Sequence, residues 1–557
     1  MPSNSVNNVT TKSPATPTPP KPEPDLIGSI LGDFGIWQLR TVLIIFLCKI
    51  PASWFMACII FTAPELYPIE EFQCDTSGIS SNVTVSEDQC YINSIDGQVE
   101  ECNSFKYTYD FNSLVMQFNL VCLRDIFVAW TQFWHLFGIL VGGVIATKMM
   151  LWISPRTTMF IGMVLQIICG CVTGFARDFT LHCAFRCLSA ACCALMFTGG
   201  HTIFADITAG KYRLGVIILY DTFWSIGLFL LPGLASFFQN WTQIYLGITF
   251  PTLVLILLLN WTPDSPRWLL RKAKDITQVE KIVRDAAKIN DRMYKIPVDF
   301  AQQLRTQAES FKNNPPKEAS WAELWTGPRA KTHLVAAHIA LAVFIINFMG
   351  MLLNIRSFGR DYLILNTIIM GFSEIVGCFL ALHLTLKYNN WKWQLAGGFN
   401  IVAGLIGFLG WTFYETSIDD DLKATLWIII AAIPKAGVSL AQSMIIACLP
   451  ELVPQHKKAP FMFSVVTWAR IWLLTAPFVN VFKKIAVPLS LSAFCFLSIV
   501  GGICLCFLLT PRPSSVPTTK YIIENGNAEV EHEPSTKDVN KAIWTVEVYD
   551  NPISSES

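Results

Sequence analysis

Long apolar runs separated by shorter polar stretches dominate this sequence. A helix needs about 20 consecutive apolar residues to cross the hydrocarbon core of a bilayer, and twelve runs reach or approach that length. They lie near 41–62, 126–150, 158–176, 181–204, 215–238, 243–261, 333–353, 362–386, 393–413, 425–449, 460–480 and 485–509. Two connections are long, with about 63 residues after the first run and about 70 after the sixth. The pattern predicts an all-α membrane protein whose twelve transmembrane helices divide six and six.

The polar stretches divide the chain into two tails, two bundles and a linker. The tails are rich in Ser, Thr and Pro, which predicts disorder on the cytoplasmic side. The linker carries apolar residues at helical spacing among charges, which is typical of short amphipathic helices lying on the inner membrane face. A solvated cap is a more common role for such a segment than a binding surface. The expected segments are a tail at 1–24, a bundle at 25–262 with an extracellular loop at 63–125, a linker at 263–332, a second bundle at 333–510, and a tail at 511–557.

Composition narrows the class of protein further. Only 15% of the residues are charged, against about 25% in average soluble chains. The formal net charge is zero, and no basic block stands out, which argues against a nucleic-acid partner. No pair of cysteines has metal-ligand spacing beside a histidine cluster, so we expect no metal site.

The cysteines indicate a loop outside the cell. Thirteen of the 17 lie in or beside apolar runs, where a free cysteine behaves as a small hydrophobe. The other four share one polar loop and allow two disulfides with three connectivities: Cys74, Cys90, Cys102 and Cys122. Disulfides form in oxidising compartments, and the loop also carries a glycosylation sequon at Asn82.

Positive charge gives the same orientation weaker support. With the N-terminus inside, the short inner loops hold eight Lys or Arg residues and the short outer loops hold six. We therefore expect a multi-pass plasma-membrane protein with both termini in the cytoplasm.

One arginine stands in the middle of the eleventh run. Arg470 interrupts FMFSVVTWARIWLLTAPFVN at 461–480, about 15 Å from either end of a helix of that length. An arginine at that depth costs at least ~2.5 kcal/mol on insertion scales, so it should face a watery cavity or a partner. We interpret it as a contact for a negatively charged solute. The alternative is an arginine that pairs with a neighbouring helix only to fix packing.

Other ionisable residues in the runs extend this hypothesis. Lys435 lies in the tenth run and Glu374 in the eighth, so a cavity lined by them and Arg470 would suit a carboxylate or a zwitterion. Aromatic walls would give an amine cation–π contact, although each such residue is more often a packing residue. The aromatic candidates are Phe223, Trp224, Phe348, Trp468 and Trp472. Asp221, Glu374 or a histidine could carry a coupling proton; whether the coupling ion is H⁺ or Na⁺ stays open.

The two halves of the sequence echo one another at their inner loops. Asp206 is followed seven residues later by Arg213, and Glu451 is followed seven residues later by Lys458. The acids are 245 residues apart, close to the length of a six-helix half. We predict salt bridges that hold one transport state closed, with compensation of helix dipoles as the alternative. Two further arginines join this gating set: Arg186 and Arg267.

Four motifs resemble the organic cation, carnitine and organic anion transporters of the major facilitator superfamily. The resemblance covers nearly everything from about Asp25 to 509. PDSPRWLL together with the cysteine-bearing loop is the specific part, and any single motif would be weak. The motifs are LGDFGIWQLR at 31–40, FNLVC at 118–122, PDSPRWLL at 263–270 and LPELVP at 449–454.

The resemblance implies two pseudo-symmetric six-helix bundles and alternating access to a site at the membrane midplane. By position, Arg470 matches an arginine typical of the anion and carnitine transporters, where cation transporters usually have Asp. Lys435 matches a basic residue of helix ten, and Glu374 matches an acid of helix eight. The inner loop after the second helix departs from the family pattern, because Thr147 and Lys148 stand where Asp and Arg are usual. The usual inner-face charge lock is therefore expected to be weakened.

These observations predict a transporter of small organic solutes, most of all zwitterionic or carboxylate-bearing ones such as carnitine-like or amino-acid-like molecules. An organic cation transporter and a non-transporting receptor or scaffold that keeps the fold are the alternatives. The runs contain no nucleophile–base constellation, so we do not expect an enzyme. The expected partners are the solute and the lipid bilayer, and no cofactor is expected.

Overall fold

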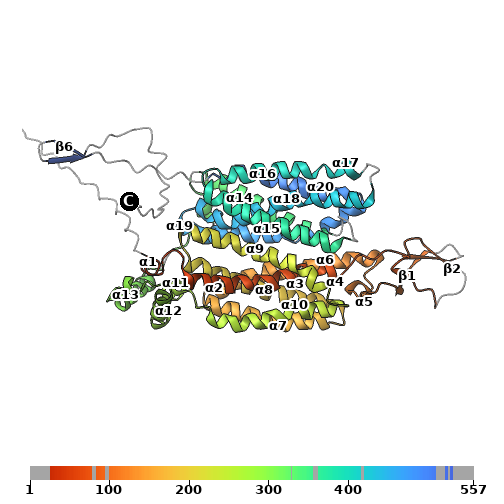
Figure 1. Ribbon diagram of the computed structural model, residues 1–557, viewed down its shortest axis with the longest axis horizontal. Coiled ribbons are helices and arrows are strands. Elements are labelled where there is room, and N and C mark those ends of the chain that lie inside the picture. The colour runs from red at the N-terminus through yellow and green to blue at the C-terminus, as the bar shows by residue number, and fades with distance from the viewer. Residues whose placement is uncertain are drawn as a thin grey trace, which may run out of the picture.

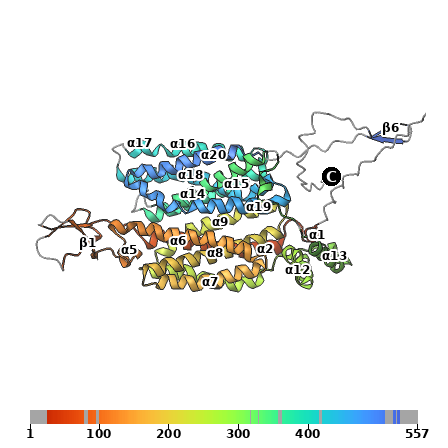
Figure 2. The same ribbon diagram turned by 180° about the vertical axis from the view of Figure 1, so that it is seen from behind.

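The computed structural model describes residues 25–77, 83–94, 99–315, 317–327, 329–355, 362–414, 419–509, 521–524 and 527–530. Within these ranges, twelve helices are long and apolar enough to cross a membrane. They form two bundles that lie side by side with their helices roughly parallel (Figures 1 and 2). The predicted all-α membrane fold with twelve spans is therefore confirmed.

The first bundle contains a broken first span and five further helices. Its first span divides at Cys48, because Pro51 has no N–H to donate to the carbonyl of Leu47 four residues earlier. Ser154 caps the third span, with Pro155 in the first helical position, where a missing N–H costs nothing. The elements are α2 (Ile36–Leu47), α3 (Lys49–Ala57), α4 (Ile59–Thr62), α6 (Ile126–Met149), α7 (Pro155–Phe175), α8 (Phe179–Ile207), α9 (Gly210–Ala235), α10 (Trp241–Leu258) and η2 (Leu259–Trp261).

The second bundle also contains six spans, and its first span, α14, is unbroken. Its α15 and α18 pack along α9 of the first bundle, and its α19 and η7 pack against α6, and these contacts form the interface between the bundles. Its elements are α14 (Ala330–Leu353), α15 (Leu363–Lys387), α16 (Lys392–Gly407), α17 (Gly410–Tyr414), α18 (Asp420–Cys448), η6 (Leu449–Leu452), α19 (Gln455–Leu473), η7 (Ala476–Lys484) and α20 (Val487–Cys506).

A small disulfide-linked unit projects from one end of the first bundle, which we call the loop end (Figure 1). The bridges join Cys74 to Cys102 and Cys90 to Cys122, one of the three connectivities that the sequence allows. Strand β1 (Phe72–Cys74) pairs with β5 (Phe105–Tyr107), and β2 (Val83–Val85), β3 (Tyr91–Ser94) and β4 (Val99–Glu101) form a second antiparallel sheet. The helices α5 (Leu114–Gln117) and η1 (Cys122–Asp125) lead back to α6. Asn82 lies outside the described residues.

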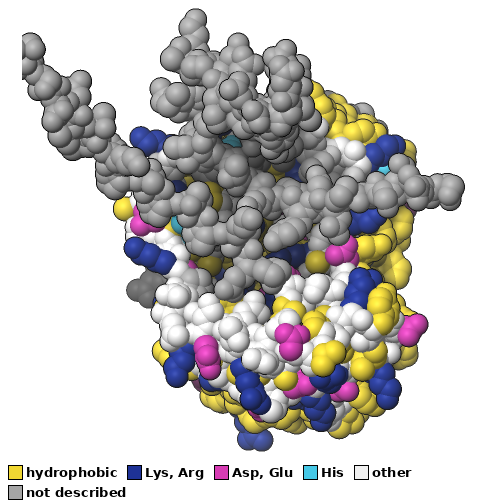
Figure 3. All heavy atoms as spheres, turned by 90° about the vertical axis from the view of Figure 1, so that its left-hand side faces the viewer, with side chains coloured by type: hydrophobic (Ala, Val, Ile, Leu, Met, Phe, Trp, Pro, Cys, Tyr) yellow, Lys and Arg dark blue, Asp and Glu magenta, His cyan; other side chains and the backbone are white. Residues whose placement is uncertain are grey.

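The opposite end, which we call the linker end, carries the predicted amphipathic helices. Their apolar residues, such as Val283, Phe300 and Leu304, are buried in a small core of their own. The outer surface of this end mixes Lys and Arg with Asp and Glu (Figure 3). The elements are α1 (Leu26–Leu31), α11 (Pro266–Arg271), α12 (Ile276–Ile289), η3 (Met293–Lys295), α13 (Phe300–Asn313) and η4 (Ala322–Trp325). A short hairpin, β6 (Tyr521–Glu524) and β7 (Asn527–Val530), follows the last span.

The disulfide pairing gives a first prediction. Peptide mapping without reduction should recover Cys74 joined to Cys102 and Cys90 joined to Cys122. In the double variant Cys74→Ser/Cys102→Ser, the loss of a bridge across 28 residues should destabilise the unit by roughly 3–4 kcal/mol in the chain-entropy picture, and proteolysis of the loop should accelerate.

The matched control is Cys74→Ser/Cys90→Ser, which has the same number of substitutions but breaks both bridges and should be cleaved faster still. A peptide that joins Cys74 to Cys90 or to Cys122 would contradict this pairing.

Candidate functional site

Helices from both bundles surround a cavity of about 130 Å³, which we call the central cavity. Its lining residues Lys49, Asp221 and Cys378 lie near the middle of the first, fifth and eighth spans. Charged, aromatic and hydroxyl side chains converge there: Lys49, Asp221, Arg470, Phe197, Trp224, Phe348, Ser225, Ser439 and Ser443.

Arg470 reaches this cavity from α19. Its guanidinium lies so close to α6 that a Cβ atom added to Gly143 would come within 1.7 Å of one of its nitrogens. A side chain at position 143 would therefore require the Arg470 side chain to move. No described residue makes a hydrogen bond or an ion pair with the Arg470 side chain. Arg470 therefore faces a cavity, one of the two surroundings that the sequence predicted. That the cavity holds water and that Arg470 contacts a solute stay predictions.

Glu374 and Lys435 form a pair behind the cavity wall. The Lys435 ammonium lies 2.7 Å from a Glu374 carboxylate oxygen, and both side chains are fully buried. Ser225, on α9 of the other bundle, donates a hydrogen bond of 2.9 Å to the Glu374 carboxylate. Lys435 also donates to the backbone carbonyl of Phe348 at 2.6 Å. The two charges cancel each other, and neither residue lines the central cavity.

A second pair, Lys49 with Asp221, lines the cavity itself. The Lys49 ammonium lies 3.4 Å from the Asp221 carboxylate, and both side chains keep some exposure, 13% and 22%. Sequence reasoning identified Asp221 but missed Lys49. The missed signal was the same one that identified Arg470, a single basic residue inside an apolar run.

The charges around the cavity do not balance. Lys49 and Lys435 are each matched by an acid, at Asp221 and Glu374 respectively. Arg470 is left over, so this set of five ionisable side chains carries one net positive charge. Charges act strongly on one another in a medium of low dielectric constant. The set therefore suits an occupant with a negative group.

Two of the five aromatic candidates line the central cavity and three lie elsewhere. The two that line it are Trp224 and Phe348. Phe223 instead packs against Phe46, with ring centroids 5.0 Å apart, and Trp468 is 43% exposed and packs on Trp472. The structure does not bring Phe223, Trp468 or Trp472 to the lining.

The predicted gating acids have other partners than the sequence suggested. Asp206 accepts a hydrogen bond of 2.5 Å from Ser265 and pairs with Arg271 at 3.3 Å. Glu451 pairs with Lys392 at 2.7 Å. Within the described ranges neither acid makes an ion pair with the base seven residues later, Arg213 or Lys458. The Asp206 pair joins the first bundle to α11 of the linker, and the Glu451 pair lies within the second bundle, so neither pair joins one bundle to the other.

Arg267 and Arg186 lie in different surroundings. Arg267 pairs with Asp25 at 2.6 Å at the linker end. Burial alone would raise the pKa of Asp25, but the hydrogen bond and the charge of Arg267 lower that pKa below its ordinary value. Arg186 is buried inside the first bundle, where it donates hydrogen bonds to Gln132 and Tyr245 and so joins α8 to α6 and α10. A gating role for these two arginines stays a prediction.

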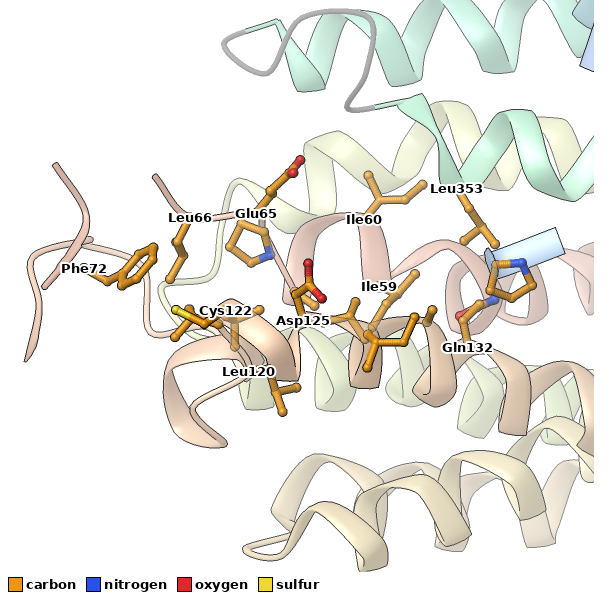
Figure 4. Close-up of a pocket in the computed structure, with 18 of the residues that line it drawn as sticks. Ile59, Ile60, Glu65, Leu66, Phe72, Leu120, Cys122, Asp125, Gln132 and Leu353 are labelled. Carbon is orange, nitrogen blue, oxygen red and sulfur yellow. The ribbon is translucent and has the colours of Figure 1, made fainter. Parts of the chain in front are cut away.

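A larger cavity of about 400 Å³ opens at the loop end, between the disulfide-linked unit and both bundles. Asp125 lies in the middle of the labelled lining residues, Phe72 lies at the end nearer the disulfide-linked unit, and Gln132 and Leu353 lie at the end nearer the bundles (Figure 4). The position of this cavity makes it a candidate entrance to the space between the bundles.

Comparison with known proteins identifies the family. The sequence profile of the Major Facilitator Superfamily matches residues 45–477. The chain belongs to this superfamily. Its relatives include an organic cation transporter protein of Drosophila melanogaster, 26% identical over 77% of each chain. Solute carrier family 22 member 13 of Homo sapiens is 25% identical over 71% of this chain and 69% of its own. The resemblance to organic ion transporters noted from the motifs is confirmed.

Solved structures support the same fold at low sequence identity. The proton:xylose symporter XylE, solved with 6-bromo-6-deoxy-D-glucose, superposes with a TM-score of 0.58 at 14% identity and covers 84% of this chain and 94% of its own. The inward-open form of XylE from E. coli gives a TM-score of 0.55 at 14% identity, over 86% of this chain and 97% of its own. The protein is thus a multi-pass membrane transporter for organic solutes, and its relatives are transporters and not enzymes.

The buried pair gives a second prediction. Glu374→Gln should leave the Lys435 ammonium without a counter-charge, which costs roughly 3–5 kcal/mol when a buried pair is broken. The unfolding temperature of the purified protein in detergent should fall clearly. The double variant Glu374→Gln/Lys435→Met removes both charges and should recover most of that loss.

Asp110→Asn is a suitable control, because Asp110 is exposed in the disulfide-linked unit. If Glu374→Gln alone unfolds at the wild-type temperature, the pair does not stabilise the second bundle.

Proposed function

We propose that this protein transports small organic solutes that bear a carboxylate, zwitterions included, and that Arg470 holds the carboxylate in the central cavity. The observation that supports the proposal is a cavity-lining guanidinium without an acidic partner among the described residues. A guanidinium can bind a carboxylate through two parallel hydrogen bonds, which gives both charge neutralisation and orientation.

The size of the central cavity favours a small solute. The volume of the central cavity is about 130 Å³. Pockets for drug-sized ligands are larger, at about 300–1,000 Å³. Trp224 and Phe348 would contact the apolar part of such a solute, and the serines on α9 and α18 would supply hydrogen bonds.

The arrangement of the bundles supports alternating access as the mechanism. Related halves that rock about a site between them expose it to each side in turn. Neither the Asp206 pair nor the Glu451 pair joins one bundle to the other, which would let each bundle move as a body. The larger cavity at the loop end would then be the outer entrance. A coupling ion, H⁺ or Na⁺, is not assigned by these observations.

An organic cation is the second candidate, because relatives carry that name and Asp221 lies beside Trp224 in the cavity. Against it stands the net positive charge of the five ionisable side chains. Uptake of tetraethylammonium by the wild-type protein would favour this candidate.

The test is uptake of radiolabelled carnitine, β-alanine, urate and tetraethylammonium into oocytes that express the protein, with counterflow for each. For any carboxylate probe that enters, Arg470→Ala should reduce uptake roughly 10- to 100-fold, because a charge-assisted hydrogen bond contributes about 1.5–3 kcal/mol. Arg470→Lys, which keeps the charge without the fork of donors, should keep part of the activity.

Arg177→Ala is the matched control, since Arg177 is exposed in the connection between α7 and α8. Normal carboxylate uptake by Arg470→Ala at equal surface expression would remove Arg470 from the site. Failure of the wild-type protein to move any of the four probes would favour the receptor or scaffold alternative.

We also propose that the protein lies in the plasma membrane with the loop end outside the cell and both termini inside. The two disulfides of the loop and the sequon at Asn82 support this orientation. Asn82→Gln should therefore reduce the mobility shift that a glycosidase produces on a gel. Asn8→Gln removes a sequon in the first tail and should leave the shift unchanged. The reverse result would invert the proposed orientation.

A further inference from the structure

We propose that Lys49 fills a cation-binding cage in the central cavity with its own ammonium group, and that it thereby determines the selectivity of the cavity against organic cations. This inference rests on the proposal that the central cavity is the solute site. According to this inference, Lys49 determines whether the cavity accepts solutes with a free positive charge or solutes with a carboxylate.

The cage consists of three aromatic rings and one carboxylate. The Lys49 ammonium lies 4.0 Å from the ring centroid of Tyr220, 4.9 Å from that of Phe197 and 5.9 Å from that of Trp224. The Asp221 carboxylate lies 3.4 Å from the same nitrogen. Aromatic rings around a cation are the arrangement by which proteins recognise quaternary ammonium groups and methylated lysines. Here the cation belongs to the protein.

The contacts of Lys49 leave it more easily displaced than the other buried lysine of this region. Lys435 lies 2.7 Å from its acid, with both side chains fully buried. The Lys49 distance of 3.4 Å is longer than the ~2.7–2.9 Å typical of a charge-assisted hydrogen bond. Its side chain also borders the cavity, whereas that of Lys435 does not. The Lys49 ammonium therefore resembles a bound ligand more closely than it resembles the lysine of a structural ion pair.

The attachment of Lys49 to α3 holds its ammonium group in the cage. Lys49 is the first residue of α3, directly after the break at Cys48 in the first span. Its side chain crosses from the first span to α8 and α9, which carry the rings and the acid. The cage is therefore filled by a tethered group in every molecule, which acts at a high effective concentration compared with a free amine.

Removal of the lysine should convert the cage into a site for a free cation. Without Lys49, the Asp221 carboxylate would face three aromatic rings and open space, and the net charge of the remaining cavity groups would fall from one positive to zero. A small quaternary ammonium ion has the size and charge to replace the lysine head group. The chemical class that fits is therefore a methylated ammonium compound.

The first experiment measures uptake of radiolabelled tetramethylammonium in oocytes. Lys49→Ala and Lys49→Ser both empty the cage and should raise saturable uptake roughly tenfold or more over wild type. Lys49→Met fills the same space without a charge and should show no gain. Lys49→Ala/Asp221→Asn removes the carboxylate as well and should lose the gain.

The second experiment measures the unfolding temperature of the purified variants with and without tetramethylammonium. Lys49→Ala and Lys49→Ser should be stabilised by the ion, and wild type and Lys49→Met should not. This readout needs neither transport nor Arg470. A shift in Lys49→Ala/Arg470→Ala would support the cage even if the carboxylate proposal fails.

Two results would overturn the inference. One is equal tetramethylammonium uptake by Lys49→Ala and Lys49→Met at equal surface expression. The other is a purified Lys49→Ala or Lys49→Ser protein that folds but does not respond to the ion, which would show that the rings around Lys49 do not form a cation site.

Discussion

A charge inside a membrane bundle needs a counter-charge, hydrogen-bond partners or water, and this constraint organises the middle of the protein. Arg186 meets it through hydrogen bonds to Gln132 and Tyr245. Two of the three cations around the central cavity satisfy it by pairing, Lys435 with Glu374 and Lys49 with Asp221. Arg470 satisfies it by lining a cavity at the interface of the bundles. An arginine sealed among apolar side chains would carry a large desolvation penalty. Arg470 can therefore stay charged at this depth because it lines the cavity, and it gives the cavity groups their net positive charge.

The apolar pattern of the sequence was enough to predict the twelve spans, because a membrane helix satisfies all its backbone hydrogen bonds within itself. The partners of the charges were harder to predict. The heptad spacing of Asp206 and Glu451 to a following base suggested local pairs, yet Arg271 and Lys392 are their partners. Those contacts depend on where the linker and the ninth span pack. The spacing of residues along the chain does not predict that packing.

Lys49 illustrates a different limit of prediction from the sequence. It stood in the sequence as a lone lysine within an apolar run, the same signal that made Arg470 conspicuous, but it lies near the break that Pro51 introduces. Its meaning emerges only when α8 and α9 bring rings and a carboxylate around it. The disulfide connectivity was open for a related reason, because four cysteines in one loop allow three pairings, and only the folded strands select one of them.

The positions of Arg470 and of the Lys49–Asp221 pair indicate how a solute in the central cavity would be coupled to movement of the bundles. A solute can bias the rocking of the bundles only if it binds one arrangement better than another. Arg470 comes from the second bundle but lies against Gly143 of the first, and the Lys49–Asp221 pair belongs to the first bundle alone. A solute held by Arg470 would therefore contact both bundles at once. The contacts of such a solute change whenever α19 moves relative to α6. A bound solute can therefore alter the geometry of the interface that surrounds the cavity.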